Sequence, residues 1–172
     1  MDRITRIILS NMMENGSIKE DDNYMNSFTT MNRDYNIDLI RAAANLWRNT
    51  SSYSYLCRLV FRNSINQTIL EIVTNEIEID NFLQSIYYQL EFNSSESVFN
   101  IGNLTLTLKR DLNYSDLYSL YIGQYSSTHQ TIVNRVKIDF TYESLIEFLN
   151  TIYFTFLSDL NTSYHSNPDF LF

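Results

Sequence analysis

One pattern occurs twice in this sequence at an offset of 66 residues, and it constrains the fold more than any other feature. Phe82–Tyr87 (FLQSIY) corresponds to Phe148–Tyr153 (FLNTIY), and the match extends backwards through a preceding apolar segment. Five of the 23 aligned positions are identical, so gene duplication and a shared structural pattern arising by chance are both consistent with the match. Either origin predicts two strand–turn–helix units.

The spacing of apolar residues predicts an amphipathic helix in each copy. Apolar side chains recur at relative positions 0, 3, 4, 7, 8 and 11, the period of one helical face. They are Ile79, Phe82, Leu83, Ile86, Tyr87 and Leu90 in the first copy, and Leu145, Phe148, Leu149, Ile152, Tyr153 and Phe156 in the second. Asn75 and Thr141 stand at the expected N-caps, and Glu78 has the spacing of a capping-box partner for Asn75.

Several other segments alternate with a period of two, which is typical of half-buried strands. The inward residues are expected to be Cys57, Leu59 and Phe61, then Leu70 and Ile72, then Leu104, Leu106 and Leu108, with Val136 and Ile138 matching the second set. Residues 93–103 are predicted to lead into the Leu104 strand as a hairpin. Residues 117–125 are predicted to form a further, tyrosine-rich strand.

The N-terminal part is predicted to be helical. Ile4, Ile7 and Ile8 follow Asp2 at helical spacing, and residues 17–35 have a loop-like, polar composition. A second helix is expected from Asn36, with an apolar face formed by Ile37, Ile40, Ala43, Ala44 and Trp47.

Together these elements predict an α+β fold: an antiparallel sheet with amphipathic helices mainly on one face. We expect a single domain over 1–172, made of an N-terminal helical segment (1–50), the sheet with two helices (53–160) and a tail (161–172). By alternation, the open face of the sheet is expected to show Arg58, Arg62, Glu71, Thr105, Thr107, Lys109, Lys137 and Asp139.

The charge composition bears on the type of partner. The formal net charge is −8, and lysine occurs only at positions 19, 109 and 137 although the Asn, Tyr and Phe usage is that of AT-rich codons, which also encode lysine. So few ammonium groups argue against direct binding to a nucleic-acid backbone. An acidic balance suits a protein partner with a basic surface, and a homo-oligomer is left open.

No catalytic, metal or cofactor signature is present, so we expect a chain that is not an enzyme and binds no cofactor or metal. The two histidines, His129 and His165, lie in polar loops without a matched pair of acid–base motifs or zinc-ligand spacing. Cys57, the single cysteine, is expected in the core, and its lack of a disulfide partner indicates a reducing compartment. The expected location is the cytoplasm, and the analogy with phage and bacterial inhibitors given below implies a bacterial cell or a phage-infected host. Neither a secretory start nor a membrane span is predicted.

Two groups of residues are candidates for an interaction surface. The acids Glu71, Glu76, Glu78 and Asp80 gather at the first strand-to-helix turn, where the helix dipole also accounts for some of them. The second group belongs to the tyrosine-rich stretch, because tyrosine gives a large contact area at low entropy cost. It comprises Tyr114, Asp116, Tyr118, Tyr121 and Tyr125, of which half should face the core if the segment is a strand.

The function expected from these features is non-enzymatic, protein-binding inhibition of a basic nucleic-acid-handling enzyme such as a nuclease. Phage anti-CRISPR proteins and bacterial toxin-immunity proteins are often small acidic proteins of this kind. The analogy rests on size, charge and fold class and not on a shared sequence motif. The alternative is a binder that sequesters a nucleotide-like small ligand, with phosphate held by Arg58, Arg62 or Lys109. A small phosphoesterase dependent on His129 and His165 is the third hypothesis.

Overall fold

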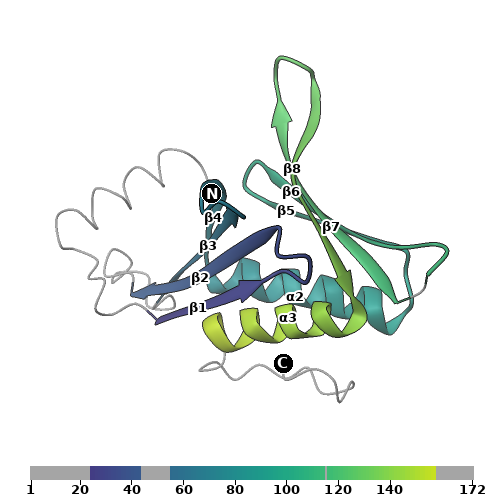
Figure 1. Cartoon of the computed structure of the whole chain (residues 1–172), viewed down its shortest axis with the longest axis horizontal. Helices are drawn as coiled ribbons and strands as arrows, with labels where there is room; N and C mark the ends of the chain where they lie inside the picture. Colours follow the sequence, from purple (N-terminus) through teal and green to yellow (C-terminus); the bar gives the residue numbers. More distant parts are fainter. Residues whose placement is uncertain (1–23, 44–54, 115, 158–172) are drawn as a thin grey trace.

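The computed structural model describes residues 24–43, 55–114 and 116–157, which form two four-stranded antiparallel sheets and two helices (Figure 1). The order of elements is the same in both halves: four strands in sequence order, followed by one helix. This arrangement confirms the predicted α+β class and the predominance of antiparallel pairing.

The first sheet consists of β1 (Tyr24–Thr29), β2 (Tyr35–Ala43), β3 (Tyr55–Asn63) and β4 (Thr68–Thr74). Each strand pairs with the next in the chain, with Leu39 opposite Leu59, and Leu59 in turn opposite Ile72. These three side chains are buried, so they form a row across the inner face of the sheet.

The second sheet consists of β5 (Glu96–Ile101), β6 (Leu104–Arg110), β7 (Leu117–Ser126) and β8 (Thr131–Thr141). Its inner row runs through Leu106, Ile122 and Val136, all of them buried. β7 and β8 continue beyond β6 as a two-stranded arm, which projects from the rest of the molecule in Figure 1. The register between β7 and β8 shifts at Ile122/Gly123, shortly before the arm begins beyond Gln124, the last β7 residue that pairs with β6.

Both predicted helices are present: α2 (Glu76–Glu91) and α3 (Tyr142–Phe156). The Asn75 side chain accepts a hydrogen bond from the Glu78 backbone N–H at 2.9 Å, which confirms Asn75 as N-cap. At the second helix Thr141 and Ser144 form a complete capping box. Each cap thus satisfies backbone donors that the first helical turn leaves without partners.

The helices join the two sheets into one hydrophobic core. α2 packs on β5 and β3, whereas α3 packs on β1 and β2 of the first sheet and on β7 and β8 of the second (Figure 1). Phe28, Phe140 and Phe148, which come from both sheets and α3, contact one another with ring centroids 5.0 to 6.4 Å apart. Burial of these apolar surfaces is the main driving force that fixes the two sheets against the helices.

Three expectations about the fold are wrong. The strands form two sheets rather than one, so Arg58, Arg62 and Glu71 lie on a different sheet from the other residues assigned to the open face. Residues 35–43 form β2 instead of a helix beginning at Asn36, because pairing with β3 buries Ile37 and Leu39. The predicted loop over 17–35 contains β1 in its described part. The helix expected around Ile4–Ile8 and the tail 161–172 lie outside the described residues.

Candidate interaction surface

The segment between β6 and β7, here called the acidic loop, is described at residues 111–114 and 116, which make several backbone hydrogen bonds. The Asp111 carboxylate accepts hydrogen bonds from the backbone N–H groups of Asn113 at 2.8 Å and Tyr114 at 3.1 Å. The Leu117 N–H donates to the Tyr114 carbonyl, and the Asp111 N–H donates to the Leu117 carbonyl. This Asx-type turn fixes the loop without burying it.

The acidic loop carries two of the most exposed apolar side chains among the described residues. Leu112 is 85% exposed and Tyr114 is 63% exposed. A neighbouring hydrogen bond, from the Tyr142 N–H to the Asp116 carbonyl at 2.8 Å, attaches the loop to the start of α3. Backbone hydrogen bonds that order a loop before binding reduce the entropy that is lost when its exposed side chains contact a partner.

Three carboxylates belong to the acidic loop and to the helical turn that is hydrogen-bonded to it. Asp111 and Asp116 lie within the acidic loop, and Glu143 occupies the first turn of α3, directly after the Tyr142 residue that bonds to the loop. All three residues are exposed. The nearest base in the sequence is Arg110, whose Nη1 donates to the Asn93 side chain at 2.8 Å. The acidic loop and the adjoining turn of α3 therefore combine two exposed apolar side chains with three exposed carboxylates.

The other tyrosines of this group divide between the core and the surface, as alternation predicts. Tyr118 is buried and packs near Tyr142, with ring centroids 6.5 Å apart, and burial raises the pKa of its hydroxyl. Tyr121 lies half-buried on the outer face, with the ammonium groups of Lys109 and Lys137 at 5.4 and 5.8 Å from its ring centroid. Tyr125 is exposed on the β7–β8 arm. These tyrosines do not form one continuous patch with Tyr114.

The acids of the first strand-to-helix turn are in unlike environments. The Glu71 carboxylate accepts a hydrogen bond from the Arg58 Nε at 2.9 Å on the outer face of the first sheet. Glu78 and Asp80 are half-buried on α2. Glu76, the first residue of α2, is only 5% exposed. A buried carboxylate cannot contact a partner protein directly, and the surface proposed below does not include it.

Glu76 belongs to an internal cluster with Cys57. Burial raises the pKa of the Glu76 carboxyl, an effect that the positive charge of Arg41 partly opposes. Burial also raises the pKa of the Cys57 thiol, and the nearby Glu76 adds to the shift. Cys57 thus lies in the core, as its sequence pattern indicates, and stays in the unreactive thiol form.

The outer face of the first sheet is dominated by paired charges. In addition to the Arg58–Glu71 pair, Arg62 Nη1 lies 3.2 Å from the Asp38 carboxylate. The phosphate-binding role expected for Arg58 and Arg62 would therefore require them to give up these carboxylates. Lys109, the third residue of that hypothesis, lies on the second sheet beside Tyr121.

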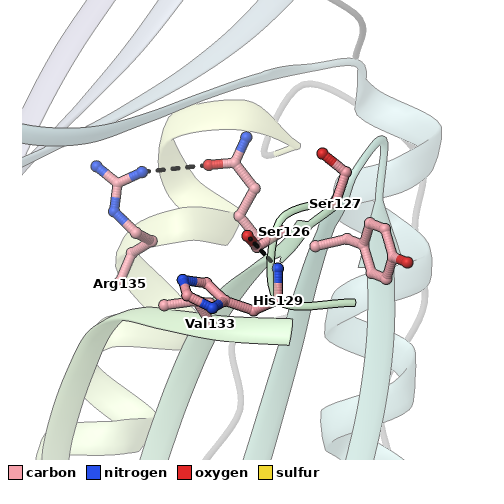
Figure 2. A pocket seen from close by; sticks show the side chains of 7 residues that line it. Ser126, Ser127, His129, Val133 and Arg135 are labelled. Carbon is pink, nitrogen blue, oxygen red and sulfur yellow. Dashed lines mark hydrogen bonds between the residues drawn. The ribbon is translucent and has the colours of Figure 1, made fainter. Parts of the chain in front are cut away.

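A shallow hollow of about 440 Å³ lies along the β7–β8 arm (Figure 2). The residues that line it are Gln124, Tyr125, Ser126, Ser127, His129, Val133 and Arg135. The Arg135 guanidinium donates from Nη1 to the Gln124 side chain and from Nη2 to the Ile69 carbonyl, both at 3.2 Å. His129 is the histidine of the phosphoesterase hypothesis, whereas its expected partner His165 lies outside the described residues.

Within the described part of the chain, no three His, Cys, Asp or Glu side chains are grouped so that they could hold a metal ion. Neither α2 nor α3 has the length and apolar character that crossing a membrane requires.

Comparison with solved structures gives distant likenesses. No protein-family model and no curated protein matches the sequence. The chain is similar to one from the crystal structures of Trypanosoma bruciei MRP1/MRP2, with 10% sequence identity and a TM-score of 0.40. The alignment covers 86% of this chain and 92% of the other.

Sequence reasoning missed Leu112, Arg135 and the hollow. Leu112 lies two residues after the end of β6, and a single leucine in a polar loop carries no pattern that predicts exposure. Arg135 interrupts the alternation of β8 at the register shift, where it reaches across to β4. Arg135 gains its role from a contact between segments far apart in the sequence.

Proposed function

We propose that this chain is a non-enzymatic binding protein that inhibits a basic, nucleic-acid-handling enzyme by docking through the acidic loop. The observation that supports the proposal is the exposure of Leu112 and Tyr114, 85% and 63% exposed, beside the turn that the Asp111 carboxylate organises. Protein interfaces commonly combine a small apolar or aromatic centre with a polar rim.

The charge of the loop determines the type of partner. Asp111, Asp116 and Glu143 repel an acidic surface and attract a basic one, so association should be accelerated by electrostatic steering and weakened by salt. Enzymes that act on nucleic acids carry basic surfaces for their substrates. An acidic protein bound there would block the substrate path. An anti-CRISPR role and a toxin-immunity role both follow this scheme, within the cytoplasm.

The test is affinity capture from a lysate of the native host, with the full chain as the immobilised protein. Mass spectrometry then identifies the captured protein, and titration measures its affinity. The parent should capture a basic protein, and association should weaken as ionic strength rises. A Leu112→Ser, Tyr114→Ala variant should weaken binding by roughly a hundredfold, as expected when interface anchors are removed.

The matched control is Ile65→Ser. Ile65 is also a highly exposed apolar residue, but it lies in the turn between β3 and β4. This variant should bind like the parent. Capture of no protein, capture of acidic proteins alone, or equal binding by the loop variant would overturn the proposal.

A further inference from the structure

The hollow on the β7–β8 arm is distinct from the acidic loop and has the opposite electrostatic character. Although the chain contains 20 acidic residues, none occurs between Asp116 and Asp139, a span that includes the whole arm. The described residues that line the hollow include one arginine and one histidine and no carboxylate. An anion could therefore enter it without meeting a like charge on the lining side chains.

Arg135 is held ready to bind such an anion. Its two terminal nitrogens each donate one hydrogen bond within the protein, to Gln124 and to the Ile69 carbonyl. An arginine side chain has further N–H donors in the same plane, suited to the oxygens of a phosphate group. The two internal bonds fix the guanidinium orientation, which reduces the entropy lost when a ligand binds.

Other lining groups add donors around the same space. Ser126 and Ser127 provide hydroxyl groups, and His129 provides an imidazole at the turn of the arm (Figure 2). The His129 backbone N–H contacts the Ser126 hydroxyl oxygen at 3.4 Å, which places the turn next to the strand. Tyr125 lines the hollow with an aromatic ring that could stack on a planar ligand.

We propose that the hollow binds a small phosphate monoester that carries a planar ring, the chemistry of a nucleoside monophosphate. Arg135 and the serine hydroxyls contact the phosphate, and the Tyr125 ring stacks on the planar group. A volume of about 440 Å³ lies within the range of small-molecule sites and accommodates a ligand of this size. This site is independent of the protein-binding function proposed above.

The test is isothermal titration of the full chain at physiological salt with three probes: AMP, adenosine and inorganic phosphate. AMP should bind saturably, and both adenosine and inorganic phosphate should bind at least about tenfold more weakly, because each lacks one of the two recognised groups. Equal affinity for adenosine, equal affinity for inorganic phosphate, or no AMP binding at millimolar concentration would overturn the proposal.

Two variants locate the binding site. Arg135→Gln should weaken AMP binding by roughly tenfold, the loss expected for a charge-assisted hydrogen bond. Lys137→Gln is the matched control, since it removes the same charge from the same strand but lies beside Tyr121 on the outer face, and it should bind AMP like the parent. Because Arg135 also contacts β4, a second variant, Ser127→Ala with His129→Gln, changes only exposed positions in the turn and should also weaken binding. Unchanged affinity in both pocket variants would overturn the assignment.

Discussion

Arg135 Nη2 donates a hydrogen bond to the backbone carbonyl of Ile69 at 3.2 Å, and these two residues are 66 positions apart in the chain. This separation equals the offset of the sequence pattern, so β4 and β8 meet at equivalent places in the two halves. The bond connects one sheet directly to the other, at the base of the β7–β8 arm.

Removing this connection should loosen the arm more than the rest of the molecule. We expect Arg135→Ala to lower the free energy of unfolding by about 0.5–1.5 kcal/mol, the net contribution of one or two hydrogen bonds that compete with water. Native-state hydrogen exchange should become faster at the amides of β7 and β8 beyond Ile122. Faster exchange spread evenly over both sheets would contradict a local role.

The three-ring cluster of Phe28, Phe140 and Phe148 should be a major contributor to stability. Phe148 is 2% exposed, and its ring centroid lies 5.4 Å from that of Phe140. Phe148→Ala leaves a cavity where α3 meets both sheets, so chemical denaturation should show a loss of about 3–5 kcal/mol.

Thr107→Ala provides the control for this measurement. Thr107 is half-exposed on β6, and its change to alanine should alter the free energy of unfolding by no more than about 0.5 kcal/mol. A large loss at Thr107 would mean that the outer face of the second sheet is covered. A small loss at Phe148 would contradict the packing of α3 against both sheets.

Gly123 permits close packing inside the β7–β8 arm. A Cβ atom at this position would collide with the Ile132 Cγ2 and would lie 2.9 Å from the Asn134 Oδ1. Gly123→Ala should therefore force the opposite strand to shift, at a cost of about 1–3 kcal/mol. Thermal unfolding measures the loss, and a Gly123→Ala, Ile132→Ala double variant should recover part of it. Equal stability of parent and Gly123→Ala would show that the two strands separate easily here.

The helices and most strands could be predicted because their signals are local. The apolar stripe of α2 and the alternation of Leu104, Leu106 and Leu108 in β6 depend only on the period of each element. Residues 36–43 could not be assigned this way, because Ile37 and Ala43 fit a helical face while Ile37 and Leu39 fit a strand. Pairing with β3 stabilises the strand conformation of residues 36–43, and this pairing outweighs the helix propensity of the alanines.

The number of sheets and the positions of the candidate surfaces also depend on distant contacts. Alternation in β4 and β6 indicates which side chains face inward. It does not reveal that these two strands belong to different sheets. Similarly, Glu76 and Glu78 are near neighbours in sequence, yet only Glu76 is buried, beside Cys57 and Arg41. Composition identified an acidic chain, whereas contacts between elements determine which carboxylates are exposed.

The buried Glu76 carboxyl should make stability depend on pH. Its Oε1 is buried and has no hydrogen-bond partner among the described residues, and burial raises the pKa of the carboxyl in the folded state above its usual value of 4.5. Between these two pKa values the folded protein binds more protons than the unfolded chain. The contribution of Glu76 to stability is therefore fully present at low pH and is lost as the pH rises through the folded-state pKa.

A Glu76→Gln variant isolates this contribution because it has a similar shape and does not titrate. We compare the free energies of unfolding of parent and variant. As the pH rises from about 4 to about 8, the variant should become more stable relative to the parent than it is at low pH. Urea denaturation of parent and variant across this range measures the change. Glu78→Gln removes a carboxylate from the same helical turn and controls for the lost interaction with the helix dipole. A carboxyl whose pKa is raised by burial must make the parent less stable, relative to the variant, as the pH rises. A difference in free energy of unfolding between parent and Glu76→Gln that stays constant with pH would therefore show that the Glu76 carboxyl has the same pKa in the folded and unfolded states.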